Sequence, residues 1–306
     1  MENSDISPYT RTRLSRSATV ARRYCDMASK VWFITGTSKG FGRIWAEAAL
    51  ARGDRVAATA RDVKTLRPLV ERYGERVAAI TLDVTDKSAV RSAVNESYDR
   101  FHRLDVVINN AGFGLFGAIE EVSETQAREQ IETNLFGALW VTQAVLPILR
   151  AQGSGHIIQV SSIGGVNAFP IVGLYHASKW GLEGFSQSLA AEVSGFGIKV
   201  TLIEPGGFAT DWGGPSAKHA TPMPAYDGTR AALETWRKGF VPGDPEATGP
   251  AILEVVDAAD PPLRVFFGTT GLPMIRAEYA KRIETWEKWN AVSIEAQGDL
   301  VGKTPR

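Results

Sequence analysis

Cysteine is almost absent from this chain of 306 residues, which contains Cys25 alone. A single cysteine excludes an internal disulfide framework and leaves no cysteine cluster that could hold zinc. This composition fits a reducing, cytoplasmic setting, which we expect for the protein. A charge excess is absent as well, because 34 Lys and Arg residues balance 34 Asp and Glu residues. No basic surplus therefore points to nucleic acid as a partner.

The chain also lacks a long uninterrupted apolar run. The stretch from residue 138 to residue 149 is broken by Thr142, Gln143 and Pro147. We therefore expect no membrane span and no membrane partner. Hydrophobic residues make up 44% of the chain and charged residues 22%, which is ordinary for a globular protein with a large core.

Residues 1–26 differ from the rest of the chain in composition. They contain five arginines and several Ser and Thr residues, but no apolar stretch of the kind that a secretory signal needs. Acidic residues, which transit peptides avoid, occur at Glu2, Asp5 and Asp26. We therefore expect a disordered N-terminal extension, or an upstream start that precedes a working start at Met27.

From residue 30 onward, short apolar runs alternate with segments of helical pattern. Strands separated by helices predict an α/β fold, a doubly wound parallel sheet with helices on both faces. No break in composition divides residues 27–306, which predicts a single domain. The expected strands are residues 31–35, 55–60, 77–81, 105–109, 156–161, 199–204 and 264–267. The expected helices are residues 41–52, 86–101, a long helix from a Ser123–Gln126 capping box to about residues 147–150, and residues 172–193, 245–256 and 273–296.

Residues 207–243 stand apart because they are rich in glycine and proline and also carry aromatic side chains, among them Trp212, Tyr226 and Trp236. Long irregular segments of compact domains often form lids or binding loops. We therefore expect a substrate lid over this range. The alternative is a surface excursion whose aromatic residues pack on the core.

A glycine-rich turn follows the first expected strand and precedes the first expected helix. Residues 35–42 read Thr-Gly-Thr-Ser-Lys-Gly-Phe-Gly, a spacing that differs from the common G-x-G-x-x-G. Glycines let the backbone approach phosphate groups closely, and a helix N-terminus offers free N–H groups to them. The setting therefore predicts a cradle for a dinucleotide pyrophosphate. The predicted cofactor contacts in this turn are Gly36, Ser38, Lys39, Gly40, Phe41 and Gly42.

The end of the second expected strand indicates which nicotinamide nucleotide binds. NAD-binding proteins commonly place Asp or Glu there to accept from the ribose hydroxyl, but this chain has Ala60 followed by Arg61. Arg61 and Lys39 suit a 2′-phosphate, because a guanidinium pairs well with phosphate oxygens. The sequence therefore favours NADP(H), with NAD(H) as the alternative if Asp62 takes the role of the acid. Asp83 is a candidate to bind the adenine amino group.

Tyr175 and Lys179 are four residues apart on an expected helix, and Ser162 precedes Tyr175 by thirteen residues. Side chains at i and i+4 share a helix face, so the ammonium can lie close to the phenol. A cation about 4 Å away, at an effective dielectric of about 20, would lower the phenol pKa by about three units. We therefore expect Tyr175 to act as a general acid and base.

Taken together, these motifs resemble the classical short-chain dehydrogenase/reductase family, in its NADP-preferring type. The resemblance implies a Rossmann-type sheet of seven strands, and hydride transfer between a nicotinamide and an alcohol or carbonyl substrate. It also implies assembly into a homodimer or a homotetramer. The motifs that carry it, besides those above, are Leu82-Asp83-Val84, Asn109-Asn110-Ala111-Gly112, Asn134, Ser161-Ser162, Tyr175-His176-Ala177-Ser178-Lys179 and Pro205-Gly206.

The resemblance assigns a role to each matching residue. It implies that Tyr175 is the general acid and base, and that Lys179 binds the nicotinamide ribose and lowers the tyrosine pKa. It implies that Ser162 holds the substrate oxygen and that Asn134 supports a water-linked proton path. His176 is left out of the chemistry, because a helical neighbour of Tyr175 points about 100° away. Further cofactor contacts implied by the family are Val84, Asn110, Ala111, Gly112, Pro205, Gly206 and Thr210.

The expected walls of the substrate pocket are apolar: residues 113–116, residues 163–170, and the lid with Trp212, Tyr226 and Trp236. We therefore expect an apolar alcohol, ketone or aldehyde as the substrate. The alternative function is a non-catalytic NADP-binding sensor or regulatory protein on the same fold. An epimerase or dehydratase fits less well, because the glycine spacing of residues 35–42 differs from T-G-x-x-G-x-x-G.

Overall fold

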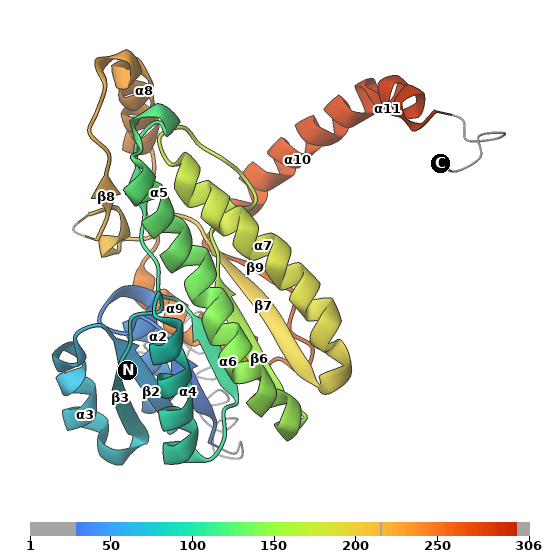
Figure 1. Ribbon diagram of the computed structural model, residues 1–306. Helices are drawn as coiled ribbons and strands as arrows, with labels where there is room; N and C mark the ends of the chain where they lie inside the picture. The colour runs from blue at the N-terminus through green and yellow to red at the C-terminus, as the bar shows by residue number, and fades with distance from the viewer. Residues whose placement is uncertain (1–28, 215, 299–306) are drawn as a thin grey trace, which may run out of the picture.

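The computed structural model of the protein describes residues 29–214 and 216–298. Seven parallel strands form one sheet in the order β3-β2-β1-β4-β6-β7-β9 (Figure 1). The predicted strands are confirmed, with ends that differ by at most one residue, whereas the extension expected at residues 1–26 lies outside the described residues. The strands are β1 (Val31–Ile34), β2 (Arg55–Ala60), β3 (Val77–Thr81), β4 (Val106–Asn109), β6 (Gly155–Val160), β7 (Ile198–Pro205) and β9 (Arg264–Phe267).

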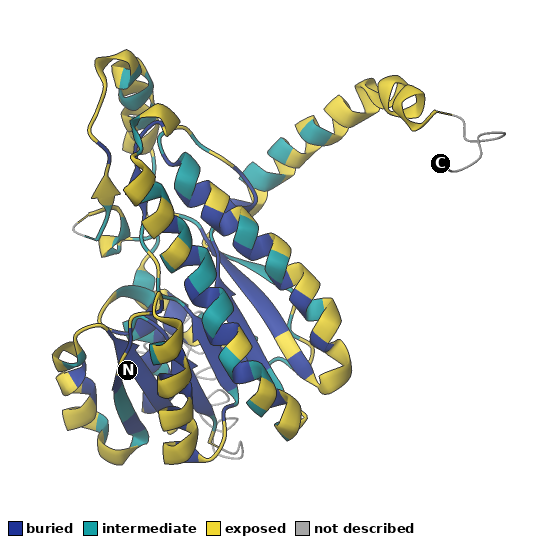
Figure 2. Ribbon diagram, in the orientation of Figure 1, coloured by how far each residue is buried: buried dark blue, intermediate teal, exposed yellow. Residues whose placement is uncertain are grey.

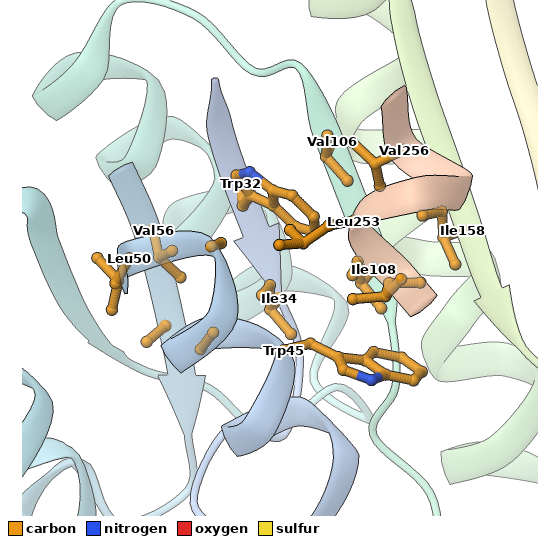
Figure 3. Close-up of a cluster of buried hydrophobic side chains, with 14 of the residues drawn as sticks. Trp32, Ile34, Trp45, Leu50, Val56, Val106, Ile108, Ile158, Leu253 and Val256 are labelled. Carbon is orange, nitrogen blue, oxygen red and sulfur yellow. The ribbon is translucent and has the colours of Figure 1, made fainter. Parts of the chain in front are cut away.

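Helices cover both faces of the sheet, as doubly wound topology requires. Successive side chains of a strand point to opposite faces, so Trp32 and Ile34 of β1 enter one core cluster while Val31 and Phe33 enter another. The first cluster packs under α2 (Gly40–Ala51) and α9 (Thr248–Asp257), with Trp45 and Leu253 among its members (Figure 3). The second packs under α4 (Lys87–Phe101), α6 (Gly137–Gln152) and α7 (Gly173–Val193), which lie together on one face in Figure 1.

The helix caps at Asp86 and Ser123 lie where the sequence predicts them. The carboxylate of Asp86 accepts from the backbone N–H groups of Ser88 and Ala89 at the start of α4. The predicted capping box of Ser123 and Gln126 opens α5 (Glu124–Ile131). The long helix expected after it is interrupted by a π turn, Glu132–Phe136, before α6 begins. Its end was predicted too early, because α6 tolerates Pro147 and continues to Gln152, where Gly153 adopts the left-handed conformation with φ of 69°.

The segment 207–243, which we expect to act as a lid, is more regular than its composition suggests. Among residues 207–243, the helix α8 (Asp227–Lys238) was not predicted, and β8 (Lys218–His219) pairs in parallel with β5 (Leu115–Phe116). The glycines and prolines that favoured an irregular segment lie mostly outside α8. The helix α3 (Arg67–Tyr73) was also not predicted. It buries one residue, Leu69, so its sequence shows no periodic apolar pattern. Short 3₁₀ turns are Val63–Leu66, Gly74–Arg76, Ile119–Glu121, Ile163–Gly165, Ser194–Phe196, Asp211–Gly213, Pro224–Tyr226 and Pro245–Ala247.

The C-terminal helices α10 (Gly271–Lys288) and α11 (Asn290–Gln297) confirm the helical segment expected there. They extend away from the sheet and are coloured mostly exposed in Figure 2. Among the described residues, none of the helices combines the length and hydropathy that a transmembrane helix requires.

Candidate active site

A cleft of about 1260 Å³ opens at the carboxyl ends of the parallel strands, where ligands bind in open α/β sheets. Segments that follow β1, β2, β3, β4, β6 and β7 all contribute to its lining. The structure thus brings the predicted catalytic and cofactor residues to one cleft, with two exceptions. Gly42 and Asn134 do not line it.

The glycine turn has the backbone conformation that its residues predict. Gly36 and Gly40 have φ of 71° and 59°, values that glycine adopts without strain. The side-chain amide of Asn110 donates to the carbonyl oxygens of Thr35 at 2.9 Å and Gly36 at 3.0 Å. A Cβ atom on Gly42 would lie 2.4 Å from the Gly36 carbonyl oxygen. Gly42 and Asn110 therefore hold the turn from behind, which leaves its outer side open as a cradle.

The end of the cleft beside β2 carries no acid at the terminus of that strand. Ala60 is the last residue of β2, and Arg61 follows it as an exposed lining residue. The carboxylate of Asp62 instead accepts from the backbone N–H of Lys64 at 3.0 Å and caps a 3₁₀ turn. Asp62 does not line the cleft, so its carboxylate serves the local fold rather than a ligand in the cleft.

Lys39 has a partner in the structure. Its ammonium lies 3.3 Å from the carboxylate of Asp211, on the segment that follows β7, and both side chains are more than half exposed. An exposed ion pair contributes at most about 1 kcal/mol. A phosphate group in the cleft would therefore compete readily with Asp211 for Lys39.

Ser162, Tyr175 and Lys179 meet at the other end of the cleft. Ser162 follows β6, and its hydroxyl accepts from the backbone N–H of Gly164 at 3.0 Å and hydrogen bonds with Tyr175. The ammonium of Lys179 donates to the carbonyl oxygen of Val160 at 2.7 Å and lies 5.8 Å from the centroid of the Tyr175 ring. Residues from one strand end and one helix face thus converge as the spacing predicts.

The expected direction of the Tyr175 pKa is wrong for this structure. Burial raises the pKa of Tyr175 to about 12, and the hydrogen bond with Ser162 opposes this only in part. The indole of Trp212 contributes to the burial, with its ring centroid 4.8 Å from that of Tyr175. Burial also lowers the pKa of Lys179 to about 8, against the charge of Glu183. Loss of water around the phenol therefore dominates the pKa of Tyr175. The ammonium of Lys179, 5.8 Å from the centroid of the ring, does not reverse this effect.

Asn134 lies behind the cleft wall, within the π turn. Its side-chain amide donates to the carbonyl oxygen of Phe113 at 3.0 Å and to the hydroxyl of Ser178 at 3.3 Å. Its side-chain oxygen accepts from the backbone N–H of Phe113 at 3.0 Å. A Cβ atom on Gly112 would lie 3.1 Å from the oxygen of Asn134 and 3.8 Å from the ammonium of Lys179. The Asn134 side chain therefore clamps the loop that separates it from Lys179, and its part in a proton path stays a prediction.

His176, which sequence reasoning set aside, braces the loop after Ser162. Its Nε2 atom accepts from the backbone N–H of Phe169 at 2.8 Å, so Nδ1 carries the proton and donates to the carbonyl oxygen of Gly164 at 2.8 Å. Burial lowers the pKa of His176 and favours this neutral form. The sequence around His176 could not reveal this role. Its two hydrogen-bond partners, Gly164 and Phe169, come within reach only because the loop after Ser162 folds back onto α7.

Aromatic residues line the part of the cleft around Tyr175, together with charged side chains such as Lys218 and Arg237. Phe113, Phe169, Trp212 and Trp236 line it, and the rings of Phe169 and Trp236 stack with centroids 5.9 Å apart. The expectation for Tyr226 is wrong, since this residue does not line the cleft and its hydroxyl donates to Glu120. The Tyr226 side chain instead lies against the carboxylate of Glu120.

Comparisons with known proteins agree with this fold and identify a family. The sequence model of a family described as short chain dehydrogenase matches residues 30–220. Oxidoreductase BOA17 of Botryotinia fuckeliana is 43% identical over 270 residues, which cover 87% of this chain and 98% of that protein.

Two solved structures are similar as well. The crystal structure of a short-chain dehydrogenase from Streptomyces avermitilis superposes with a TM-score of 0.82 at 38% identity and covers 88% of this chain and 99% of that one. An alcohol dehydrogenase from Thermococcus sibiricus, complexed with 5-hydroxy-NADP, gives a TM-score of 0.67 at 27% identity, over 80% of this chain and 98% of that one. The chain therefore belongs to the short-chain dehydrogenase family and is an oxidoreductase.

Proposed function

We propose that this protein is an NADP(H)-dependent oxidoreductase that interconverts an apolar alcohol and the corresponding ketone or aldehyde, with Tyr175 as the general acid and base. The observation that carries the proposal is the meeting of Ser162, Tyr175 and Lys179 in the same cleft as the glycine turn. A sensor that only bound a nucleotide would not need these three groups together.

The residues present fit a dinucleotide cofactor. The cradle is open where Gly36 and Gly40 bear no side chain, and a Cβ on Gly42 would collide with the turn itself. Pro205 at the end of β7, with Gly206 and Thr210 after it, lines the cleft, and Asp83 and Val84 line it after β3. We propose that these residues hold the nicotinamide and adenine ends respectively. The Thermococcus sibiricus relative, solved with 5-hydroxy-NADP, supports this cofactor class.

In the proposed mechanism the cofactor, when bound, supplies or accepts the hydride. Ser162 and Tyr175 donate hydrogen bonds to the substrate carbonyl oxygen, and Tyr175 transfers its proton to that oxygen during reduction. The high pKa of Tyr175 in this structure, about 12, describes a protonated phenol ready to donate. Lys179 would hold the ribose hydroxyls of a bound cofactor, and its charge would favour the phenolate after transfer. Asn134 would keep the loop at Phe113 in place while water returns the proton.

The aromatic walls support an apolar substrate. Trp212 covers Tyr175 and also contacts Phe116, with ring centroids 5.4 Å apart. Because Trp212 belongs to the segment after β7, we propose that residues 207–243 act as the lid and that Trp212 moves when the substrate enters. Two rings on facing elements, Phe169 and Trp236, would then contact the apolar part of the substrate.

Assembly into a homodimer or homotetramer is part of the same proposal. Its support is apolar surface left exposed on the described residues. Trp180 on α7 is 39% exposed, and Ile283 and Trp286 on α10 are 49% and 65% exposed. Single exposed apolar residues are common, but a group on neighbouring helices is typical of a contact surface.

Replacing Arg61 with alanine should weaken NADPH binding while leaving NADH binding unchanged. A hydrogen bond to a charged group contributes about 1.5–3 kcal/mol, and we expect the lower end because Arg61 is exposed. This corresponds to roughly tenfold in affinity. Titrations of cofactor fluorescence measure both dissociation constants. The matched control is Lys64→Ala, which removes a nearby exposed cation that does not line the cleft. Equal losses for the two cofactors would contradict the 2′-phosphate assignment.

The function itself is tested by a screen for turnover. The full-length protein is mixed with NADPH and a panel of bulky apolar ketones and aldehydes, and loss of the nicotinamide absorbance is followed. The proposal predicts turnover with apolar members and weak or no turnover with phosphorylated sugars. Tight NADPH binding without turnover across the whole panel would favour the sensor instead.

A further inference from the structure

Two buried glutamates outside the proposed catalytic set lie next to it. Glu183 is on α7, one turn after Lys179, and Glu204 is near the end of β7; they are 5% and 1% exposed. Carboxylates are almost never buried to this degree without a partner. The neighbouring cation is Arg264 at the start of β9, whose guanidinium lies 2.8 Å from Glu183 and 3.6 Å from Glu204.

One guanidinium cannot neutralise two buried carboxylates. Burial and the charge of Glu183 raise the pKa of Glu204, although Arg264 opposes the shift. Of the two carboxyls, Glu204 therefore favours the proton, which it shares with Glu183 in a hydrogen bond. Each glutamate has one buried carboxyl oxygen without another hydrogen-bond partner, and a proton between the two gives both oxygens a partner. Arg264 lies closer to Glu183 than to Glu204, at 2.8 Å against 3.6 Å, so the geometry places the negative charge of the group on Glu183.

The position of Glu183 relates it to the catalytic end of the cleft. It follows Lys179 by four residues on the same helix face. Its side-chain oxygen and the hydroxyl of Ser161 both lie beside Gly165, at 3.3 Å and 2.5 Å from where a Cβ of that glycine would be. The carboxylate thus lies under the loop that begins at Ser162.

Lys179 needs an anion nearby because its ammonium is buried. The residue is 6% exposed, and its ammonium donates a hydrogen bond to the neutral carbonyl of Val160. A buried charge is costly unless an opposite charge or strong hydrogen bonds offset the loss of water. Glu183 is the charged group that opposes the effect of burial on the pKa of Lys179.

We infer that Glu183 is a positioning residue for Lys179: its carboxylate, fixed by Arg264 and by the neighbouring carboxyl of Glu204, is the counter-charge that keeps the buried ammonium charged. The inference rests on the proposed function in so far as Lys179 serves the cofactor and Tyr175. The charged groups around Glu183 are Lys179 on its own helix, Glu204 on β7 and Arg264 on β9.

A pH titration without cofactor tests the inference independently of turnover. The folded-state pKa of Lys179, about 8, lies below that of an unfolded lysine, about 10.4. The native state therefore binds fewer protons in this window, and this group makes stability rise with pH between the two values. In Glu183→Gln the rise should begin at a pH lower by about one unit, because the carboxylate no longer favours the ammonium. In Lys179→Met this contribution to the rise of stability with pH should be absent.

A second titration follows NADPH binding over the same pH range. Affinity should fall as Lys179 loses its charge, and the midpoint of this fall should be lower in Glu183→Gln by the same shift. When Glu183 loses its charge, Glu204 can ionise beside Arg264 and replace part of that charge. The double variant Glu183→Gln/Glu204→Gln removes both carboxylates and is therefore the stricter test. The matched control is Glu204→Gln alone, since an amide resembles the protonated acid in shape and charge and should leave both midpoints unchanged.

The outcomes separate this inference from the proposed function. Failure of the wild type to bind NADPH would contradict the proposed function, while the cofactor-free titration would still decide the role of Glu183. A Glu183→Gln variant with wild-type midpoints, or a Glu204→Gln shift as large as that of Glu183→Gln, would overturn the inference. Should Glu183→Gln not fold, Glu183→Asp takes its place, with a smaller shift in the same direction expected and no shift overturning it.

Discussion

Replacing Tyr175 with phenylalanine is expected to lower kcat by about 100-fold to 10,000-fold with every carbonyl substrate, because the general acid is lost. The dissociation constant of NADPH should change by less than about twofold, since the cradle at Gly36 and the cations at the other end of the cleft are untouched. The phenylalanine ring would still fill the space beside Trp212, so the fold should persist. Steady-state kinetics and cofactor titration measure the two effects separately.

The matched control for this substitution is Tyr226→Phe. Tyr226 also loses a hydroxyl, but that hydroxyl donates to Glu120 and lies outside the cleft lining. We expect turnover close to that of the wild type. Substantial activity in Tyr175→Phe, or an equal loss in both variants, would show that the phenol is not the proton donor.

Replacing Gly42 with alanine should weaken NADPH binding by about tenfold to a hundredfold. The new Cβ would lie 2.4 Å from the carbonyl oxygen of Gly36 and 2.5 Å from the amide nitrogen of Asn110. One of these groups must move, and such overpacking costs about 1–3 kcal/mol. Because both groups define the turn, the cost should reduce cofactor affinity and also lower the melting temperature by a few degrees. Calorimetric titration and thermal unfolding measure the two changes.

Gly184→Ala is the matched control for that substitution. Gly184 lies within α7, and a Cβ there would meet nothing within 4 Å. Alanine stabilises a helix interior relative to glycine by about 0.5–1 kcal/mol, so stability should rise slightly and NADPH affinity should stay unchanged. Wild-type affinity in Gly42→Ala would contradict the role of the closely packed turn in holding the cofactor.

The sheet could be predicted from sequence because its strands are short, buried and apolar. The four residues of β1, Val31–Ile34, are all buried, and a glycine turn follows them. The caps at Asp86 and Ser123 likewise depend on neighbours within three residues. Local patterns of this kind do not depend on the rest of the fold.

The two helices that were missed, α8 and α3, escaped prediction for different reasons. α8 has an apolar side, from which Leu233 and Trp236 line the cleft, but the glycines and prolines around the helix suggested a loop. In α3 the buried residue is Leu69 alone. Periodicity needs several turns to be visible in a sequence.

The chemical identity of the site could be predicted, but its electrostatics could not. The spacing from Ser162 to Tyr175 and Lys179 is local information, and the structure brings these groups together. The raised pKa of Tyr175 instead reflects burial, to which Trp212 from the segment after β7 contributes. The pairing of Glu183 with Arg264 joins residues distant in the chain. Both depend on tertiary packing that no spacing reveals.

The most direct test of the account follows the fate of a hydrogen isotope. The protein is incubated with NADPH that carries deuterium at one face of nicotinamide C4 and with an apolar ketone that the screen identifies as a substrate. The account predicts that one of the two face-labelled cofactors delivers deuterium to the carbinol carbon of the alcohol, and that Tyr175→Phe slows this transfer by about 100-fold to 10,000-fold. Alcohol formed without deuterium from either labelled cofactor would contradict direct transfer in this cleft.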